Sequence, residues 1–79
     1  MRKSHRERTE LRTTESPFAH LIMFDGDEIG KLTTITTTGE RLVFDNFNRT
    51  HEMLDFPDGD EGRMEIAVQF AIFMDMEMR

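Results

Sequence analysis

The sequence predicts an all-β fold, with about five antiparallel strands in a small sheet or open barrel behind a mobile basic N-terminal arm. Short apolar or β-branched runs recur along the chain, and turn-forming pairs such as Asp-Gly separate them. The length of 79 residues accommodates one small domain. We therefore divide the chain into a flexible arm over residues 1–16 and a single small β domain over residues 17–79.

The arm is predicted to be mobile because it has almost no apolar side chains. Leu11 is the one large apolar residue between Met1 and Phe18, so a helix there would have no apolar stripe to pack. Residues 1–12 carry five basic and two acidic side chains, a net charge of +3. The basic residues are Arg2, Lys3, Arg6, Arg8 and Arg12. Such residues neutralise nucleic-acid phosphates or keep a tail in solution, and both interpretations stay open.

Four strands are expected in the first part of the domain, over residues 18–25, 28–38, 40–47 and 52–56. The second is rich in threonine and isoleucine, whose branched side chains lose rotamer freedom in a helix and fit a pleated surface. Asp25-Gly26 and Gly39-Glu40 mark the first two turns, because Asp and Gly tolerate the backbone conformations that tight turns need, and the polar stretch from Asn46 to Thr50 marks the third.

The C-terminal segment predicts the fifth strand, over residues 63–77. Apolar residues occupy every second position from Met64 to Met78, which is typical of a strand with one buried face. A helix is the alternative, because methionine, alanine, glutamate and glutamine all favour helices. We expect a core of nine apolar residues: Leu21, Met23, Ile35, Leu42, Phe44, Ile66, Val68, Phe70 and Ile72.

A strand of this length also predicts a homo-oligomer, with a dimer as its simplest form. From Met64 to Met78 it would span about 50 Å, whereas a domain of this size is only about 30 Å across. The projecting part would expose an apolar row that a second subunit could cover. The predicted interface residues are Ile72, Met74, Met76 and Met78.

Acidic side chains dominate the rest of the chain. The formal net charge is −6, so residues 13–79, with five basic and fourteen acidic side chains, carry −9. The acids concentrate in two turns, and the predicted partner-binding residues are Asp25, Asp27, Glu28, Asp58, Asp60 and Glu61. Neither turn has the twelve-residue ligand spacing of an EF-hand, so no metal site is expected. The acids either dock a basic partner or only maintain solubility.

Several chemistries find no support in the sequence. Cysteine is absent, which excludes disulfides and thiolate zinc sites. The histidines His5, His20 and His51 have no metal-ligand spacing, and there is no nucleophile elbow or phosphate-binding glycine loop. No apolar run approaches the ~20 residues that span a bilayer, and no signal-peptide core follows Met1. We expect a cytoplasmic protein without cofactor, membrane association or enzymatic activity.

Two functional hypotheses follow. The first is a non-enzymatic protein-binding regulator or inhibitor whose acidic surface docks a basic partner, such as a nucleic-acid-handling protein. The alternative is a small oligomeric RNA- or DNA-binding protein that uses its basic arm.

Overall fold

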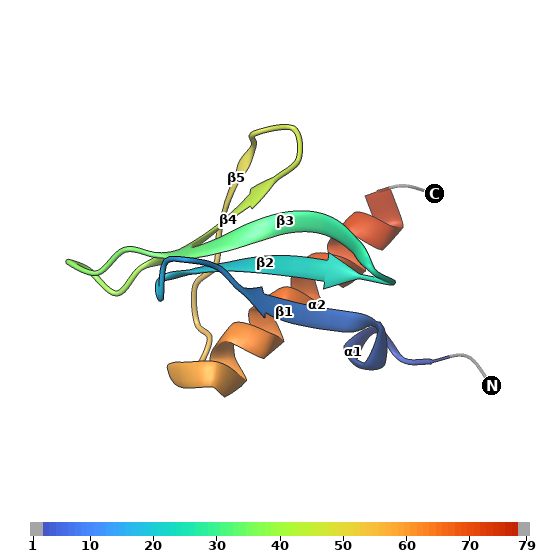
Figure 1. Ribbon diagram of the computed structural model, residues 1–79, viewed down its shortest axis with the longest axis horizontal. Coiled ribbons are helices and arrows are strands. Elements are labelled where there is room, and N and C mark those ends of the chain that lie inside the picture. Colours follow the sequence, from blue (N-terminus) through green and yellow to red (C-terminus); the bar gives the residue numbers. More distant parts are fainter. Residues whose placement is uncertain (1–2, 78–79) are drawn as a thin grey trace.

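The computed structural model describes residues 3–77, which form a five-stranded antiparallel sheet with one long helix against one face (Figure 1). The strands lie in the sheet in chain order, β1-β2-β3-β4-β5, and each pairs antiparallel with the next. The elements are α1 (His5–Arg8), β1 (Thr9–Thr13), β2 (Ala19–Phe24), β3 (Asp27–Thr34), β4 (Arg41–Asp45), β5 (Thr50–Glu52) and α2 (Gly59–Glu77).

The predicted five-stranded antiparallel open sheet is confirmed, but the fold is not all-β, because a long C-terminal helix accompanies the sheet, and the strands are not all the predicted ones. β2 and β4 fall within predicted strands, and β3 matches the predicted strand over residues 28–38 except that it begins one residue earlier, at Asp27. The fourth predicted strand, residues 52–56, overlaps β5 only at Glu52, because β5 runs from Thr50 to Glu52. The remaining strand is β1, which lies in the segment predicted to be an arm.

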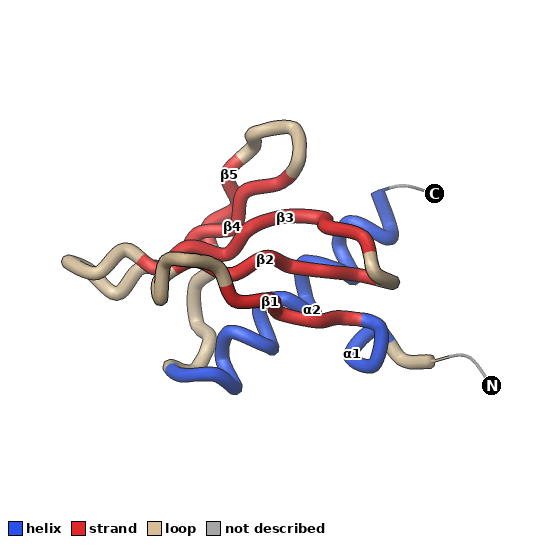
Figure 2. Tube along the Cα trace, viewed as in Figure 1, coloured by secondary structure: helices blue, strands red, loops and turns tan. Residues whose placement is uncertain are grey.

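The prediction of a strand over residues 63–77 is wrong, because this segment is the helix α2 (Figure 2). Its buried residues include Ile66, Ala67, Phe70, Ala71 and Met74, which recur at the spacing of one helix face. Ala67 and Ala71 belong to this buried face, although the predicted strand would have placed them on its exposed side. The alternation of large apolar residues therefore did not identify the buried face. Among residues 3–77, no helix has the length and apolar character needed to cross a membrane.

The core lies between α2 and the helix-facing side of the sheet. Ile22, Leu32 and Val43 contribute from the three central strands, and all three are fully buried. Phe70 of α2 packs so close to β3 that a Cβ at Gly30 would lie 2.8 Å from its ring. Glycine at this position therefore allows the helix to approach the sheet closely.

The predicted core was partly wrong because two strands are apolar on both faces. Of the nine predicted residues, Met23, Ile66, Val68 and Phe70 are buried, whereas Leu21, Ile35, Leu42, Phe44 and Ile72 are only half-buried. Leu21, Leu42 and Phe44 lie on the face of the sheet away from α2, because their strand neighbours Ile22 and Val43 point toward it.

The structure also corrects the prediction of a flexible arm over residues 1–16, as far as residues 3–16 are described. Ser4 and Glu7 form a capping box at the start of α1. β1 pairs with β2 over its full length, and Leu11 packs against the core. Pairing with β2 and the packing of Leu11 hold this polar segment against the sheet, so it needs no apolar stripe of its own.

The geometric reason for an oligomer through the C-terminal segment no longer holds. As a helix of 19 residues, α2 is about 28 Å long and stays within the molecule, whose longest extent is 42 Å. Of the four predicted interface residues, Met74 is buried, Ile72 is half-buried and Met76 is 71% exposed. Met78 lies outside the described residues.

Candidate protein-binding pocket

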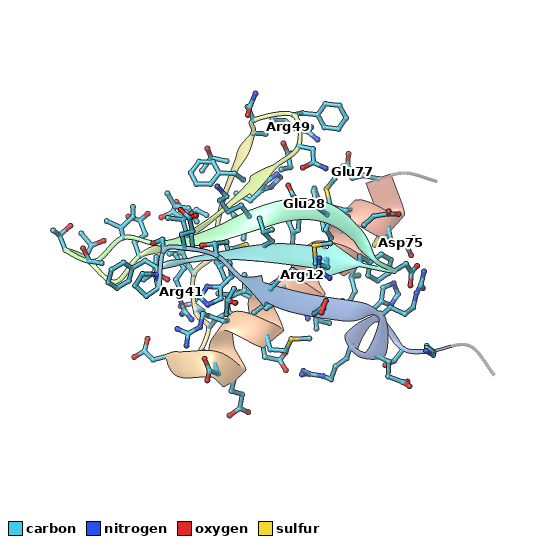
Figure 3. The ribbon with its side chains drawn as sticks, in the orientation of Figure 1. Arg12, Glu28, Arg41, Arg49, Asp75 and Glu77 are labelled. Atoms are coloured by element: carbon cyan, nitrogen blue, oxygen red, sulfur yellow. The ribbon has the colours of Figure 1, made fainter. Side chains whose placement is uncertain are left out.

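A pocket of about 470 Å³ lies where the β2–β3 turn, the β4–β5 loop and the last turns of α2 meet. Its apolar lining comes from Phe24, Ile29, Phe47, Ala71 and Met74. Its polar lining comes from Arg8, Asp25, Asp27, Glu28, Asn46 and Asp75. Figure 3 shows Glu28 and Asp75 at this end of the molecule, with Arg41 at the other end. We call this site the acidic pocket.

The β2–β3 turn forms one wall because it is a two-residue hairpin loop. Asp25 and Gly26 both have positive φ, 53° and 83°, as in the type I′ turn that suits the twist of two paired strands. Just beyond the turn, Gly30 pairs with Ile22 and Glu28 pairs with Met23, so Ile29 is an extra residue in β3. This bulge allows Ile29 to pack against the core and line the pocket.

The opposite wall is the β4–β5 loop, which is organised by the carboxylate of Asp45. The Asp45 side chain has 0% exposure and accepts four hydrogen bonds. The backbone N–H groups of Phe47 and Arg49 donate to Oδ1 at 2.9 Å each. Arg49 Nε and His51 Nε2 contact Oδ2 at 2.9 and 3.0 Å. One buried carboxylate thus fixes the whole loop.

The same hydrogen bonds determine the charge of Asp45. Four hydrogen bonds hold the pKa of Asp45 well below its usual range, and the one from His51 has the largest effect. The others come from the backbone N–H groups of Arg49 and Phe47 and from the Arg49 side chain. Burial of the carboxylate opposes this shift. The His51 ring also packs edge-on against Phe70 and Phe73 of α2. Asp45 therefore stays ionised and links the loop, β5 and the helix.

The anchored loop presents an aromatic side chain at the pocket. Phe47 is 74% exposed, and the guanidinium of Arg49 lies 5.6 Å from its ring. Next to it, Asn46 Nδ2 donates to the backbone carbonyl of Glu28 at 2.9 Å, which joins the loop to β3. Two walls far apart in sequence are thus held together, and the exposed Phe47 ring lines the pocket from the loop.

Arg8 shows how this pocket interacts with a guanidinium group. Its Nε donates to Asp25 Oδ1 at 2.8 Å and its NH2 bonds Asp25 Oδ2, a bidentate pairing. The same guanidinium lies 4.3 Å from the centroid of the Phe24 ring. The side-chain hydrogen bonding between Arg8 and Asp25 lowers the pKa of the Asp25 carboxyl and raises the pKa of the Arg8 guanidinium.

Helix α1 contacts two residues that line the pocket, Asp75 of α2 and Phe24 of β2. His5 Nε2 lies 3.2 Å from Asp75 Oδ2, and the His5 ring stacks on Phe24 at 5.7 Å between centroids. Asp27 and Glu28, in contrast, form no ion pair with any described residue. These two acids are therefore the charges that a bound cation would meet first.

The structure divides the six predicted acidic site residues between two ends of the molecule. Asp25, Asp27 and Glu28 line the acidic pocket, near the end of α2. Asp58 directly precedes α2, and Asp60 and Glu61 lie in its first turn, about 20 Å along the helix from Met74 in the pocket. There Asp60 is paired with Arg63, which lowers the pKa of Asp60. The predicted acidic surface is thus two separate groups.

Most of the predicted nucleic-acid-binding side chains are engaged within the protein. Arg6 pairs with Glu65, Arg8 pairs with Asp25, and Arg12 lies 3.0 Å from Glu10. Lys3 is exposed, and Arg2 lies outside the described residues. Phosphate binding by these arginines would compete with the intramolecular pairs.

The chemistry available in the pocket is binding of a cation with an apolar stem. Phenyl rings and aliphatic side chains bury such a stem, and carboxylates pair with the charged head. In residues 3–77, no group of three histidine, aspartate or glutamate side chains is arranged to hold a metal ion. The His51–Asp45 pair resembles part of a catalytic relay, but both Asp45 oxygens are occupied by the loop.

Sequence reasoning missed three residues that build the pocket: Asp45, Phe47 and Asp75. Asp45 is the last residue of β4, as expected from the predicted strand over residues 40–47, but its side chain was not predicted to organise the loop that follows. An aspartate directly before the turn-like sequence Asn-Phe-Asn-Arg is typical of loops closed by a side-chain hydrogen bond, and that signal could have indicated its role. Asp75 joins the pocket only because its segment is a helix, so the strand prediction concealed it.

Comparison with protein-family models, curated proteins and solved structures finds no match to this chain.

Proposed function

We propose that this protein is a non-enzymatic binding module that regulates or inhibits a protein partner with a basic surface. The observation that carries the proposal is the acidic pocket, where apolar side chains lie together with the carboxylates of Asp27 and Glu28, which form no ion pair with a described residue. A partner of this kind could be a nucleic-acid-handling protein, since such proteins present basic grooves. We expect the two to meet in the cytoplasm.

The proposed mode of binding is insertion of one arginine or lysine side chain of the partner into the acidic pocket. Its aliphatic stem would lie against Phe47 and Met74, while its charged head approaches Asp27 and Glu28. The contacts of Arg8 support this mode, because they combine a bidentate carboxylate pair with an aromatic ring within the same site. Arginine is favoured over lysine, because its planar group uses both contacts.

The acids at the other end of the molecule would affect the rate at which a basic partner associates. Asp58 and Glu61 are exposed and too distant to touch a side chain in the pocket. Their charge would accelerate the approach of a basic partner over long distances, and this contribution would fade as salt increases. The pocket acids would determine how long the complex lasts.

Affinity capture from cell extract tests the proposal. Three tagged proteins are compared: the unchanged chain, the pocket variant Asp27→Asn/Glu28→Gln, and the control variant Asp58→Asn/Glu61→Gln. Both variants lose two negative charges, so they have the same net charge and differ only in where it is lost. We expect the pocket variant to retain at least tenfold less of the partner than the control variant does.

Nuclease treatment separates this proposal from RNA or DNA binding through Arg2, Lys3, Arg6, Arg8 and Arg12. Capture that survives nuclease and depends on Asp27 and Glu28 supports the protein partner. Capture that nuclease abolishes, with both variants behaving alike, would contradict it and favour the nucleic-acid alternative.

A further inference from the structure

Strand β1 is a free edge of the sheet. It pairs with β2 on one side, and residues 3–77 supply no strand on the other side. An unpaired edge exposes a row of backbone donors and acceptors that can pair with another chain.

The ladder between β1 and β2 identifies the outward groups. Asp25 N–H donates to the carbonyl of Arg8 at 3.0 Å, so these two residues form a hydrogen-bonded pair. Hydrogen-bonded and non-hydrogen-bonded pairs alternate along an antiparallel ladder, so Glu10 and Arg12 also bond to β2. The residues whose backbone groups face the open edge are Thr9, Leu11 and Thr13.

The sequence of β1, Thr-Glu-Leu-Arg-Thr, is complementary to itself when reversed. In an antiparallel pair of two copies centred on Leu11, Glu10 of each copy faces Arg12 of the other, and Thr9 faces Thr13. Centring the pair on Glu10 or on Arg12 instead would place like charges directly opposite each other. Opposite charges across a strand pair stabilise it and like charges destabilise it, so the charges select one register.

The charged side chains do not obstruct this pairing. Leu11 packs against the core, so Glu10 and Arg12 project from the other face of the sheet, where they are 57% and 55% exposed. They already contact each other at 3.0 Å within one copy. In the paired arrangement, four alternating charges would form one group on this face.

The backbone bonds are also consistent with the register centred on Leu11. Leu11 of each copy would exchange both of its hydrogen bonds with Leu11 of the other. Thr9 N–H already donates to the carbonyl of Arg6 at the end of α1, so Thr9 has its carbonyl left to offer. That carbonyl faces Thr13 N–H of the other copy. The pair would therefore contain four backbone hydrogen bonds.

A hollow beside β1 provides room on the helix-facing side. It has a volume of about 470 Å³ and lies between β1 and the first turns of α2, where Arg63 and Met64 line it. In the antiparallel pair, the second copy's Leu11 points to this same side. Its side chain would extend the apolar surface around Leu11 and Met64.

We propose that β1 is the interface of a homodimer in which two sheets join into one continuous ten-stranded sheet. A two-fold axis through Leu11 keeps both α2 helices on the same face of that sheet. The dimer is independent of the proposed binding function, although it would give an assembly with two acidic pockets.

Charge exchange in β1 tests the interface, with the mass measured by sedimentation over a range of concentrations. Glu10→Arg alone and Arg12→Glu alone place like charges opposite each other, and each should weaken the dimer by roughly tenfold or more. The double variant Glu10→Arg/Arg12→Glu restores opposite charges and should dimerise like the unchanged chain. Mixing the two single variants should produce a mixed dimer, because each supplies the charge that the other lacks.

Thr13→Pro tests the backbone bonds separately. Its N–H faces the open edge, and proline is tolerated where an edge strand needs no donor, so the fold should persist by circular dichroism while the dimer is lost. The proposal is overturned if the unchanged chain keeps its 9.3 kDa monomer mass at millimolar concentration. It is equally overturned if the single charge variants or Thr13→Pro dimerise as well as the unchanged chain.

Discussion

A single residue, Asp45, connects the stability of the protein to its candidate function. Its carboxylate accepts hydrogen bonds from two backbone N–H groups, from Arg49 and from His51, and it is fully buried. These bonds hold Phe47 beside the acidic pocket. A change at Asp45 should therefore affect folding and binding together, although Asp45 is not among the residues that line the acidic pocket.

We predict that Asp45→Asn lowers the melting temperature by several degrees at neutral pH. The asparagine amide has nearly the same shape, but its NH₂ group cannot accept bonds, so at least one donor among Arg49 and His51 loses its partner. Asp58→Asn is the matched control, because it removes one charge from an exposed acid and should leave the melting temperature almost unchanged.

The pH dependence of stability gives a second test of Asp45. Its pKa is lower in the folded protein than in the unfolded chain, so its stabilisation is complete above the unfolded value of about 4. It is lost as the pH falls from there toward the folded pKa. Between pH ~4 and pH ~2, urea unfolding should show a shallower decline for Asp45→Asn than for the unchanged chain. Parallel declines would contradict this role.

At the scale of an element, α2 shows why the sequence prediction was wrong for a quarter of the chain. Period-two alternation of large apolar side chains suggested a strand, but the buried face uses Ala67 and Ala71, which lay at the positions assigned to the exposed side. Strong helix formers and the acids Asp60 and Glu61 in the first turn were the signals for a helix. β2 and β4 have apolar residues on both faces, so their sequences do not show which face is buried. The position of α2 determines it.

The start of α2 depends on close contact with the preceding loop. Arg41 donates to the carbonyls of Phe56 and Pro57, both at 2.6 Å, which fixes that loop beside β4. A Cβ at Gly62 would overlap the Pro57 carbonyl oxygen. Glycine is therefore required here by the approach of the backbone and not by its own dihedral angles.

We predict that Gly62→Ala destabilises the protein by about 1–3 kcal/mol, even though alanine is the better helix former. Either the loop or the first turn of α2 must move to make room for the methyl group. The free energy of unfolding in urea measures this effect. Gln69→Ala, at an exposed position of the same helix, is the control and should change stability by less than about 0.5 kcal/mol. A stabilised Gly62→Ala would show that the contact with Pro57 is absent.

At the scale of the whole molecule, the charges of the two parts of the sequence interact within one fold. The basic N-terminal segment predicted as an arm is joined to the acidic body through Arg6, Arg8 and His5. Sequence alone could identify the charge asymmetry, the β2–β3 turn and three of the strands. It could not bring Asp75 to Asp27, because that juxtaposition depends on α2 being a helix that crosses the sheet.

A nuclear magnetic resonance titration of the isotope-labelled protein with N-acetyl-arginine amide tests most directly whether the acidic pocket binds a basic side chain. At low ionic strength, we expect saturable shift changes concentrated at Asp27, Glu28, Phe47 and Met74, and their loss in Asp27→Asn/Glu28→Gln. Non-saturating changes of equal size at Asp58 and Glu61, or an unaffected Phe47, would contradict it.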